Sequence, residues 1–179
     1  MSPPRRSRAQ RRSPDELDGH AVAPAAQRTR VVLIEDNPAD VYLIQRELDR
    51  QGPGLEFVHY WDGDEALRHL LPGSGGTFVA PDLIFLDLRL PGIAGHEVLQ
   101  ILRGEPRMQG VRIVIISGAH PAQLSPADLA GSNQFIHKSM DLDDYLQNIR
   151  DAVASVARDG RQSPRRARAQ DDAAQDTSR

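Results

Sequence analysis

The chain has 179 residues, of which 22 are basic and 25 acidic, so its formal net charge is −3. This balance excludes a uniformly basic nucleic-acid binder, and nucleic acid is not an expected partner. The absence of cysteine excludes disulfide scaffolds, cysteine-ligated metal sites and a cysteine nucleophile. No run approaches the roughly 18 apolar residues of a membrane helix, and the first 30 residues lack the apolar part of a signal peptide. We therefore expect a cytoplasmic protein without a membrane segment.

The two ends of the chain differ from its middle. Residues 1–30 contain seven arginines and three acidic residues, and residues 158–179 contain six arginines and four acidic residues. Both ends have few large apolar side chains, so they cannot bury enough surface to offset the entropy of ordering. We predict disordered tails over 1–28 and 158–179 around one domain over 29–157. Solvated tails without function and tails that contact nucleic acid or an acidic partner both remain open.

Short apolar runs rich in β-branched residues alternate with segments of helical spacing. The runs predict five buried strands, which cover residues 31–34, 55–60, 83–86, 113–116 and 135–136. The other segments predict five helices, which begin near Pro38, Asp62, Gly95, Pro121 and Asp141. Asn37, Asp62 and Asp141 have the side chains of N-cap residues. The fourth helix is expected to be weak because Pro126 interrupts it.

Two helices carry apolar patterns that lead to specific expectations. In the third helix, the inward face is predicted to consist of Val98, Ile101 and Leu102. The last helix has apolar residues at alternating steps of three and four, a spacing that suits a seam between two helices: Leu142, Tyr145, Ile149, Ala152 and Val156. These side chains can pack on the sheet of their own domain or meet a second copy of the helix. The second possibility predicts a homodimer.

The alternation of strands and helices predicts an α/β domain with a parallel sheet covered on both faces. In such sheets ligands bind beyond the carboxyl ends of the strands. The predicted strands end in polar residues, namely Glu35, Asp36, Asp87, Ser117 and Lys138. Three carboxylates, a hydroxyl and an ammonium group are therefore expected at one edge of the sheet.

This set of side chains points to phosphoryl chemistry. Clustered carboxylates repel one another, and a hard cation with oxygen ligands, such as Mg²⁺, relieves that repulsion. Lys138 is the only lysine among the 22 basic residues, which suggests a site that needs a compact point charge. Taken singly, Glu35 and Asp36 can be acids at a helix N-terminus, Asp87 a turn residue and Lys138 a surface residue. Their joint placement at successive strand ends favours a site that binds a metal and a phosphoryl group.

The sequence resembles the receiver domains of response regulators of the CheY-like kind. The matching stretches are VVLIEDNPAD, PDLIFLDLRLPGIAG, IVIISGA and FIHKS, in this order. The resemblance covers about residues 29–157 and implies a flavodoxin-like (βα)5 fold with strand order 2-1-3-4-5. It implies a non-enzymatic phosphoacceptor that receives a phosphoryl group from a sensor histidine kinase. Because the segment after Val156 is short, we expect a stand-alone receiver.

The resemblance also assigns roles to single residues. It implies that Asp87 is the phosphoacceptor and that Asp36 is a direct ligand of Mg²⁺, with Glu35 acting through a metal-bound water. The backbone carbonyl of Arg89 would complete the metal site. Lys138 would pair with the phosphoryl group. The resemblance further implies that two residues form the switch, the hydroxyl of Ser117 and the aromatic ring of Phe135. It places a dimer interface on the fourth helix, fifth strand and fifth helix.

Some details are specific to this chain. The EDNPAD opening and the Lys138-Ser139 pair are similar to single-domain regulators that serve phytochrome histidine kinases. Many receivers have a cis proline after the lysine, and the sequence leaves open whether the Lys138–Ser139 bond is cis or trans. Arg89, two residues after the acceptor, occupies a position that is associated in the family with the lifetime of the acyl phosphate.

Three other functions compete with a phosphoacceptor. A receiver-like scaffold that only docks partners would have lost an acid or the lysine, and neither is lost here. A flavin site would need a Ser/Thr/Gly-rich loop after the first strand, where this chain has Glu-Asp-Asn-Pro. A phosphatase of the haloacid dehalogenase type would need a second aspartate where Arg89 stands.

Overall fold

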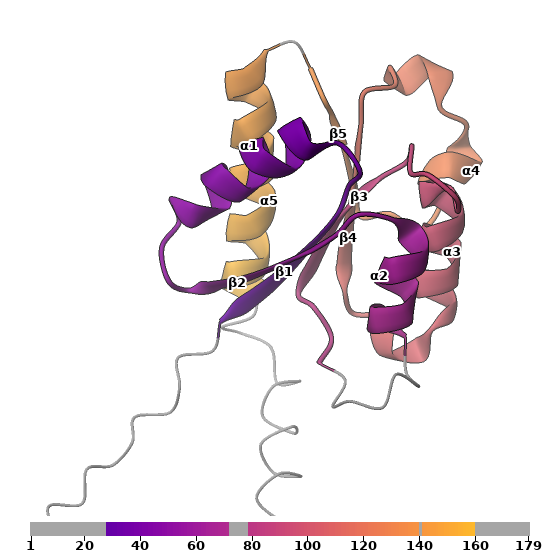
Figure 1. Cartoon of the computed structure of the whole chain (residues 1–179), viewed down its shortest axis with the longest axis horizontal. Helices are drawn as coiled ribbons and strands as arrows, with labels where there is room; N and C mark the ends of the chain where they lie inside the picture. The colour runs from indigo at the N-terminus through magenta and orange to yellow at the C-terminus, as the bar shows by residue number, and fades with distance from the viewer. Residues whose placement is uncertain (1–27, 72–78, 140, 160–179) are drawn as a thin grey trace, which may run out of the picture.

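The computed structural model describes residues 28–71, 79–139 and 141–159. In this part of the chain five parallel strands form one sheet in the order β2-β1-β3-β4-β5, as expected (Figure 1). The strands are β1 (Thr29–Ile34), β2 (Leu55–Tyr60), β3 (Leu83–Asp87), β4 (Arg112–Ser117) and β5 (Gln134–His137). Strand β1 pairs with both β2 and β3, so the sheet has its switch point between β1 and β3.

Helices cover both faces of the sheet (Figure 1). One face carries α1 (Pro38–Asp49) and α5 (Leu142–Asp159), and the other carries α2 (Gly63–Leu70), α3 (Gly95–Gly104) and α4 (Pro126–Leu129). Along the central strands successive side chains alternate between the two apolar cores: Ile84 and Leu86 face one core, and Leu83 and Phe85 face the other. The apolar run Leu83–Leu86 of β3 therefore suits a strand that helices cover on both faces.

The predicted N-caps are confirmed. The Asn37 side chain accepts a hydrogen bond from the Ala39 amide at 2.9 Å, and Pro38 opens α1. The Asp62 carboxylate accepts from the Glu65 amide at 2.6 Å. Asp141 accepts from two amides at the start of α5. These caps fix the first turns of helices whose N-termini follow strand ends.

Two local expectations are corrected. In α3 the inward positions are Val98, Leu99 and Leu102, whereas Ile101 is 40% exposed. The apolar face of α3 that packs on the sheet includes Leu99. Ile101 lies at the edge of that face. The predicted fourth helix divides into a 3-10 turn over Pro121–Gln123 and the short α4, because Pro126 starts a new capped turn after Ser125.

The apolar residues spaced by three and four along α5 pack inside their own domain. Tyr145, Ile149, Ala152 and Val156 are all less than 10% exposed and belong to the core between α1, α5 and the sheet. Leu142 is 45% exposed and lies outside that core. The interpretation of this spacing as a contact with a second copy is therefore wrong, because the sheet already covers these side chains. The spacing on α5 therefore gives no support for a homodimer, which rests on the family resemblance alone.

Most of the predicted tails lie outside the described residues, and their disorder stays a prediction. The domain itself reaches slightly further than expected, because α5 continues to Asp159.

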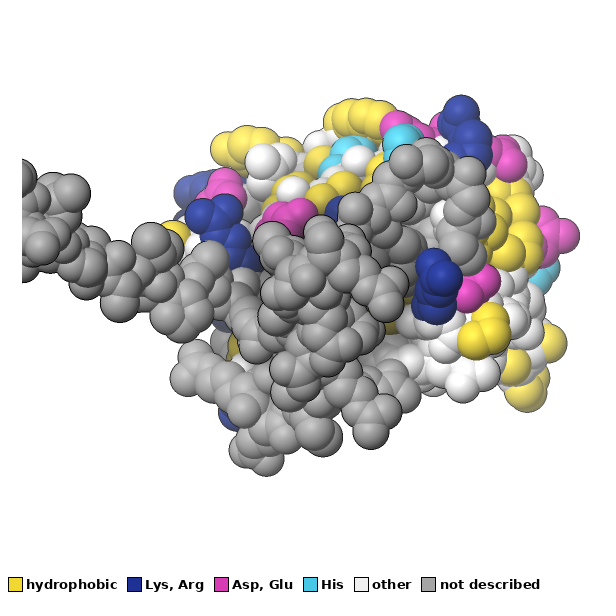
Figure 2. All heavy atoms as spheres, turned by 90° about the horizontal axis from the view of Figure 1, so that it is seen from below, with side chains coloured by type: hydrophobic (Ala, Val, Ile, Leu, Met, Phe, Trp, Pro, Cys, Tyr) yellow, Lys and Arg dark blue, Asp and Glu magenta, His cyan; other side chains and the backbone are white. Residues whose placement is uncertain are grey.

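Within the described residues no helix combines the length and apolarity that crossing a bilayer requires. Basic and acidic side chains lie interspersed on the face seen in Figure 2. Cytoplasmic location and the absence of a nucleic-acid partner stay predictions.

Candidate functional site

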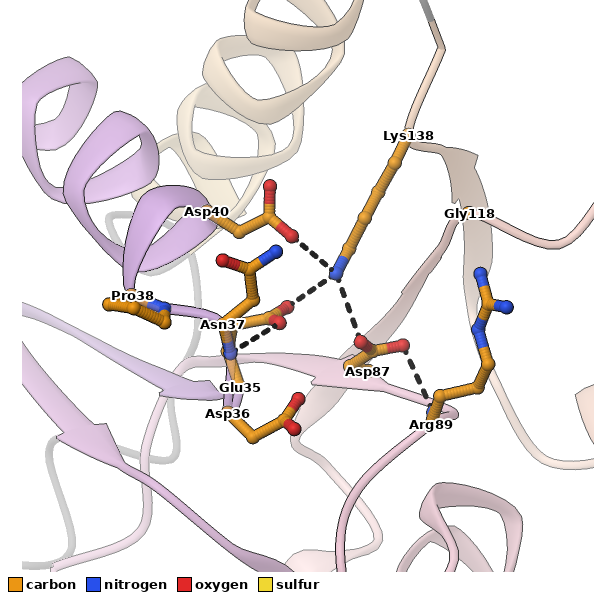
Figure 3. Close-up of a pocket in the computed structure, with 9 residues that line it drawn as sticks. All are labelled: Glu35, Asp36, Asn37, Pro38, Asp40, Asp87, Arg89, Gly118 and Lys138. Atoms are coloured by element: carbon orange, nitrogen blue, oxygen red, sulfur yellow. Dashed lines mark hydrogen bonds and ion pairs between the residues drawn. The ribbon is translucent and has the colours of Figure 1, made fainter.

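A pocket opens where β1, β3 and β5 end (Figure 3). Its lining comes from the β1–α1 connection, the first turn of α1, the ends of β3 and β4 and the residue after β5: Glu35, Asp36, Asn37, Pro38, Asp40, Asp87, Arg89, Gly118 and Lys138. The structure therefore brings five predicted site residues together. Parallel strands make this possible, because all their carboxyl ends lie at the same edge.

Lys138 is the centre of charge in this pocket. Its Nζ donates to Glu35 Oε2 at 2.7 Å, to Asp40 Oδ2 at 2.9 Å and to Asp87 Oδ2 at 2.9 Å (Figure 3). Burial by itself would lower the pKa of Lys138, but the hydrogen bond to Glu35 and the charge of Asp87 outweigh it and raise the pKa above its usual value. The lysine is therefore held as a cation.

Glu35 is fully buried beneath the pocket. One carboxylate oxygen accepts from Lys138, and the other accepts from the Asn37 amide at 3.2 Å. Burial raises the pKa of Glu35 to about 7, and the hydrogen bond and charge of Lys138 act in the opposite direction. The Glu35 backbone carbonyl lies 2.9 Å from His59 Nε2, and the His59 ring meets Trp61 edge-on at 4.3 Å between centroids. Trp61 is thus connected to the pocket through His59.

Asp87 ends β3 and is 5% exposed. Its Oδ2 contacts Lys138, and its Oδ1 accepts a hydrogen bond from the Arg89 amide at 3.1 Å. A side chain held at both oxygens has a fixed direction, and here it points into the pocket (Figure 3). Asp87 is also backed by α3, since Gly95 packs directly against the backbone of Asp87 and Leu88.

Three carboxylates are arranged as a cation site. Glu35, Asp36 and Asp87 each offer an oxygen, and these oxygens lie within 4.8 Å of one another. Glu35 and Asp87 are buried, whereas Asp36 is exposed at the mouth of the pocket. An oxygen-only set of this size fits Mg²⁺, which keeps several waters of its own. The residues present therefore fit the metal that the sequence predicts.

The Arg89 side chain runs along one side of the pocket toward Gly118, the residue after β4 (Figure 3). A Cβ atom on Gly118 would lie 2.8 Å from the Arg89 guanidinium, so the glycine leaves room for this side chain. The pocket lining therefore contains a second cation besides Lys138. The Lys138–Ser139 peptide bond, which the sequence left open, is trans.

The two predicted switch residues lie outside this lining. Ser117 is fully buried at the end of β4, and its Oγ accepts from the Ala119 amide at 3.2 Å. Phe135 on β5 is partly buried and packs against the core on the α2–α3 face. Their switch roles stay predictions, as does the role of the Arg89 carbonyl in metal binding.

Sequence reasoning missed Asp40. This carboxylate binds Lys138, although it lies two residues into α1 rather than at a strand end. A detectable signal existed, because an acidic residue in the first turn after an Asn-Pro cap must lie close to the pocket that the cap borders.

Comparison with known proteins identifies the family of this domain. Residues 31–150 match the family model described as response regulator receiver domain. The probable methanogenesis regulatory protein FilR2 of Methanothrix harundinacea is 30% identical over 134 residues, which are 74% of this chain and 86% of FilR2. Response regulator Rcp1 of Synechocystis is 29% identical over 125 residues, 66% of this chain and 82% of Rcp1. Some relatives are longer, and the match spans only 52% of the transcriptional regulatory protein YkoG of Bacillus subtilis.

Solved structures of response regulators have a similar fold. The phosphorylated cyanobacterial phytochrome response regulator RcpA superposes with a TM-score of 0.63 at 32% identity, over 69% of this chain and 90% of RcpA. The Mn²⁺-bound form of Rcp1 gives a TM-score of 0.62 at 28% identity, over 69% and 90%. The bacteriophytochrome response regulator AtBRR gives 0.56 at 30% identity, over 70% and 93%. From its sequence, its strand order and the acidic edge with its lysine, this chain belongs to the family of response regulator receiver domains.

Proposed function

We propose that this protein is a phosphoacceptor of two-component signalling and that Asp87 takes the phosphoryl group. The observation that carries this proposal is the position of the Asp87 carboxylate, buried at a strand end with Lys138 Nζ at 2.9 Å and the Glu35 and Asp36 carboxylates beside it. A carboxylate in this setting is held at both oxygens and borders the pocket. These are the properties that an acyl-phosphate acceptor needs.

The proposed donor is a phosphohistidine on a sensor histidine kinase. An Asp87 carboxylate oxygen attacks the phosphorus and forms the new P–O bond, while the P–N bond breaks and its electron pair returns to the histidine nitrogen. Lys138 neutralises charge on the phosphoryl oxygens, and Gly118 leaves space for the Arg89 guanidinium in the same pocket. Arg89 would lie next to the acyl phosphate that results. The protein acts as a phosphoacceptor and not as an enzyme on a separate substrate.

Mg²⁺ is the proposed cofactor, held by Asp36, Glu35 and Asp87 with the Arg89 carbonyl. When bound, it supplies positive charge that offsets the repulsion between the carboxylates and a phosphoryl dianion. The fit of three closely spaced oxygens supports this assignment. The Mn²⁺-bound form of Rcp1 is a relative in which a divalent cation is present.

A phytochrome-type histidine kinase is the first candidate for the partner. RcpA, Rcp1 and AtBRR are similar to this chain at 28–32% identity over more than two thirds of it, and RcpA and AtBRR are described as phytochrome or bacteriophytochrome regulators. We place the exchange in the cytoplasm.

A homodimer through α4, β5 and α5 stays a prediction from the family resemblance. Sedimentation of the full chain with and without beryllofluoride tests this prediction.

Acetyl phosphate and intact mass provide the direct test. With Mg²⁺ the full-length protein should gain the mass of one phosphoryl group, and Asp87→Asn should gain none, because an amide cannot form the acyl phosphate. Asp49→Asn, an exposed acid at the far end of α1, is the matched control and should react like wild type. Modification of Asp87→Asn at wild-type yield would falsify the assignment. Transfer from a phosphorylated phytochrome-type kinase, compared with an unrelated histidine kinase, tests the choice of partner.

A further inference from the structure

Tyr145 is a buried phenol that the chemistry above does not use. It lies in the first turns of α5, is 3% exposed and packs in the core between α1, α5 and the sheet. Its hydroxyl is buried and has no hydrogen-bond partner among the described residues. A buried hydroxyl without a partner is uncommon in folded proteins and is destabilising compared with a phenylalanine of the same shape.

Tyr145 lies in the core close enough to the polar pocket for the pocket's charges to act on it. Besides its burial, four charges act on it, and in decreasing order they belong to Lys138, Asp40, Glu35 and Asp87. Helix α5 packs against α1, which carries Asp40, and against β5, which Lys138 follows, so Tyr145 near the start of α5 belongs to the layer that borders these two residues. In Figure 3 the ribbon of α5 stands above Asp40 and to one side of Lys138.

The hydrogen bonds of Lys138 show when such a hydroxyl would be needed. An ammonium group has three donors, and Lys138 uses three, on Glu35, Asp40 and Asp87. The donor that Lys138 gives to Asp87 can pass to a phosphoryl group on that residue, and a second Lys138 donor becomes available to the phosphoryl group only if Glu35 or Asp40 is released. Asp40 is the one that belongs neither to the candidate metal ligands nor to the acceptor, and it is the most exposed of the three.

We propose that Tyr145 is a positioning residue for the phosphoryl-loaded site: its hydroxyl donates to the Asp40 carboxylate when Lys138 turns from Asp40 to the phosphoryl group. The hydroxyl then gains a charged acceptor, and Asp40 keeps a donor after losing the lysine. Tyr145 thus favours the loaded state over the empty one. This inference rests on the proposed role of Asp87 and adds a residue outside the pocket lining to it.

The test uses Tyr145→Phe in the full chain, with beryllofluoride and Mg²⁺ as the phosphoryl mimic. Calorimetry should show beryllofluoride binding that is roughly tenfold weaker than in wild type, because the loaded state loses a charge-assisted hydrogen bond. Affinity for Mg²⁺ alone should not change, since Lys138 then stays on Asp40. In EDTA the midpoint of thermal unfolding should equal or exceed that of wild type. Tyr42→Phe, an exposed tyrosine on α1, is the control and should behave as wild type.

A double-mutant cycle identifies the acceptor. In an Asp40→Ala background, adding Tyr145→Phe should have no further effect on beryllofluoride affinity. The inference is overturned if Tyr145→Phe binds as wild type, if the loss persists without Asp40, or if the variant unfolds at a lower temperature in EDTA. A wild-type chain that binds no beryllofluoride would instead defeat the proposed function, and this inference with it. These outcomes separate the two failures.

Discussion

Glu35 and Lys138 form a buried pair whose protonation states are set by opposing influences. Burial disfavours both charges, and their hydrogen bond at 2.7 Å favours both. For Lys138 the partners prevail, since three carboxylates surround one ammonium group. For Glu35 burial prevails, and its pKa lies at about 7 in the folded protein. The two residues therefore respond differently to pH.

The metal-free protein should lose stability as the pH rises toward 7. Folded Glu35 keeps its proton up to a pKa of about 7, whereas the unfolded side chain releases it near 4.5. Between these values the folded state binds more protons, so the free energy of unfolding falls with rising pH, by at most about 1.4 kcal/mol per pH unit from this group. Urea unfolding in EDTA from pH 5 to 8 measures this effect.

Glu35→Gln is the matched variant for that measurement. Its amide does not titrate, so the difference in stability between Glu35→Gln and wild type should grow across this pH range in favour of the variant. A constant difference would show that Glu35 titrates at its ordinary pKa. Lys138 does not confuse the result, because its raised pKa keeps it charged throughout the range.

At the scale of elements, close packing between α3 and β3 holds the acceptor in place. Helix α3 begins at Gly95, whose amide donates to the Leu88 carbonyl at 3.1 Å. A Cβ atom at this position would collide with the Asp87 carbonyl oxygen and would lie 2.6 Å from Leu88 Cα. Both obstacles are backbone, which cannot turn aside as a flexible side chain can. The helix therefore approaches the acceptor strand this closely only with glycine at residue 95.

Gly95→Ala should consequently damage both stability and the site. We expect a loss of about 2 kcal/mol in the free energy of unfolding, which is typical of an overpacked interior. Gly104→Ala is the control in the same helix, because a Cβ there meets nothing within 4 Å and alanine suits a helix better than glycine. Denaturant unfolding of both variants measures the difference, and equal stabilities would contradict the packing argument.

Across the whole molecule, topology assembles the site from distant parts of the chain. Lys138 is 103 residues from Glu35 and 51 from Asp87 in sequence, yet its Nζ contacts both. The parallel sheet places their strand ends together. Glu35 and Asp87 are buried between the helical layers and the sheet. A cation bound there would hold β1 to β3 and so would stabilise the fold as a unit.

Mg²⁺ should therefore raise the unfolding temperature of the full chain. At about 100 times its dissociation constant a ligand adds about 2.7 kcal/mol, which is a shift of several degrees for a chain of this size. Asp36→Ala should remove most of this shift with little change in metal-free stability, since Asp36 is exposed. Asp49→Ala, a similarly exposed acid, should keep the shift. An undiminished shift in Asp36→Ala would place the metal elsewhere.

Local sequence signals were sufficient for the elements and for most of the pocket. The apolar runs of β1, β3 and β4 and the caps at Asn37, Asp62 and Asp141 are local features, and each lies where the sequence predicted it. Once the strands are parallel, Glu35, Asp36, Asp87 and Lys138 must meet, because each follows or ends a strand. Such predictions need only the order of elements and the rule for ligand placement.

Only the tertiary structure decided which neighbour each side chain meets. The spacing of apolar residues on α5 suits packing against either a sheet or a second helix. In the structure Tyr145, Ile149 and Val156 are buried in the core of the same domain, so this face of α5 packs on the sheet. The contact of Asp40 with Lys138 and the buried hydroxyl of Tyr145 depend on how α5 packs against α1 and β5. Sequence periodicity specifies the face of a helix, whereas packing geometry alone determines what lies against that face.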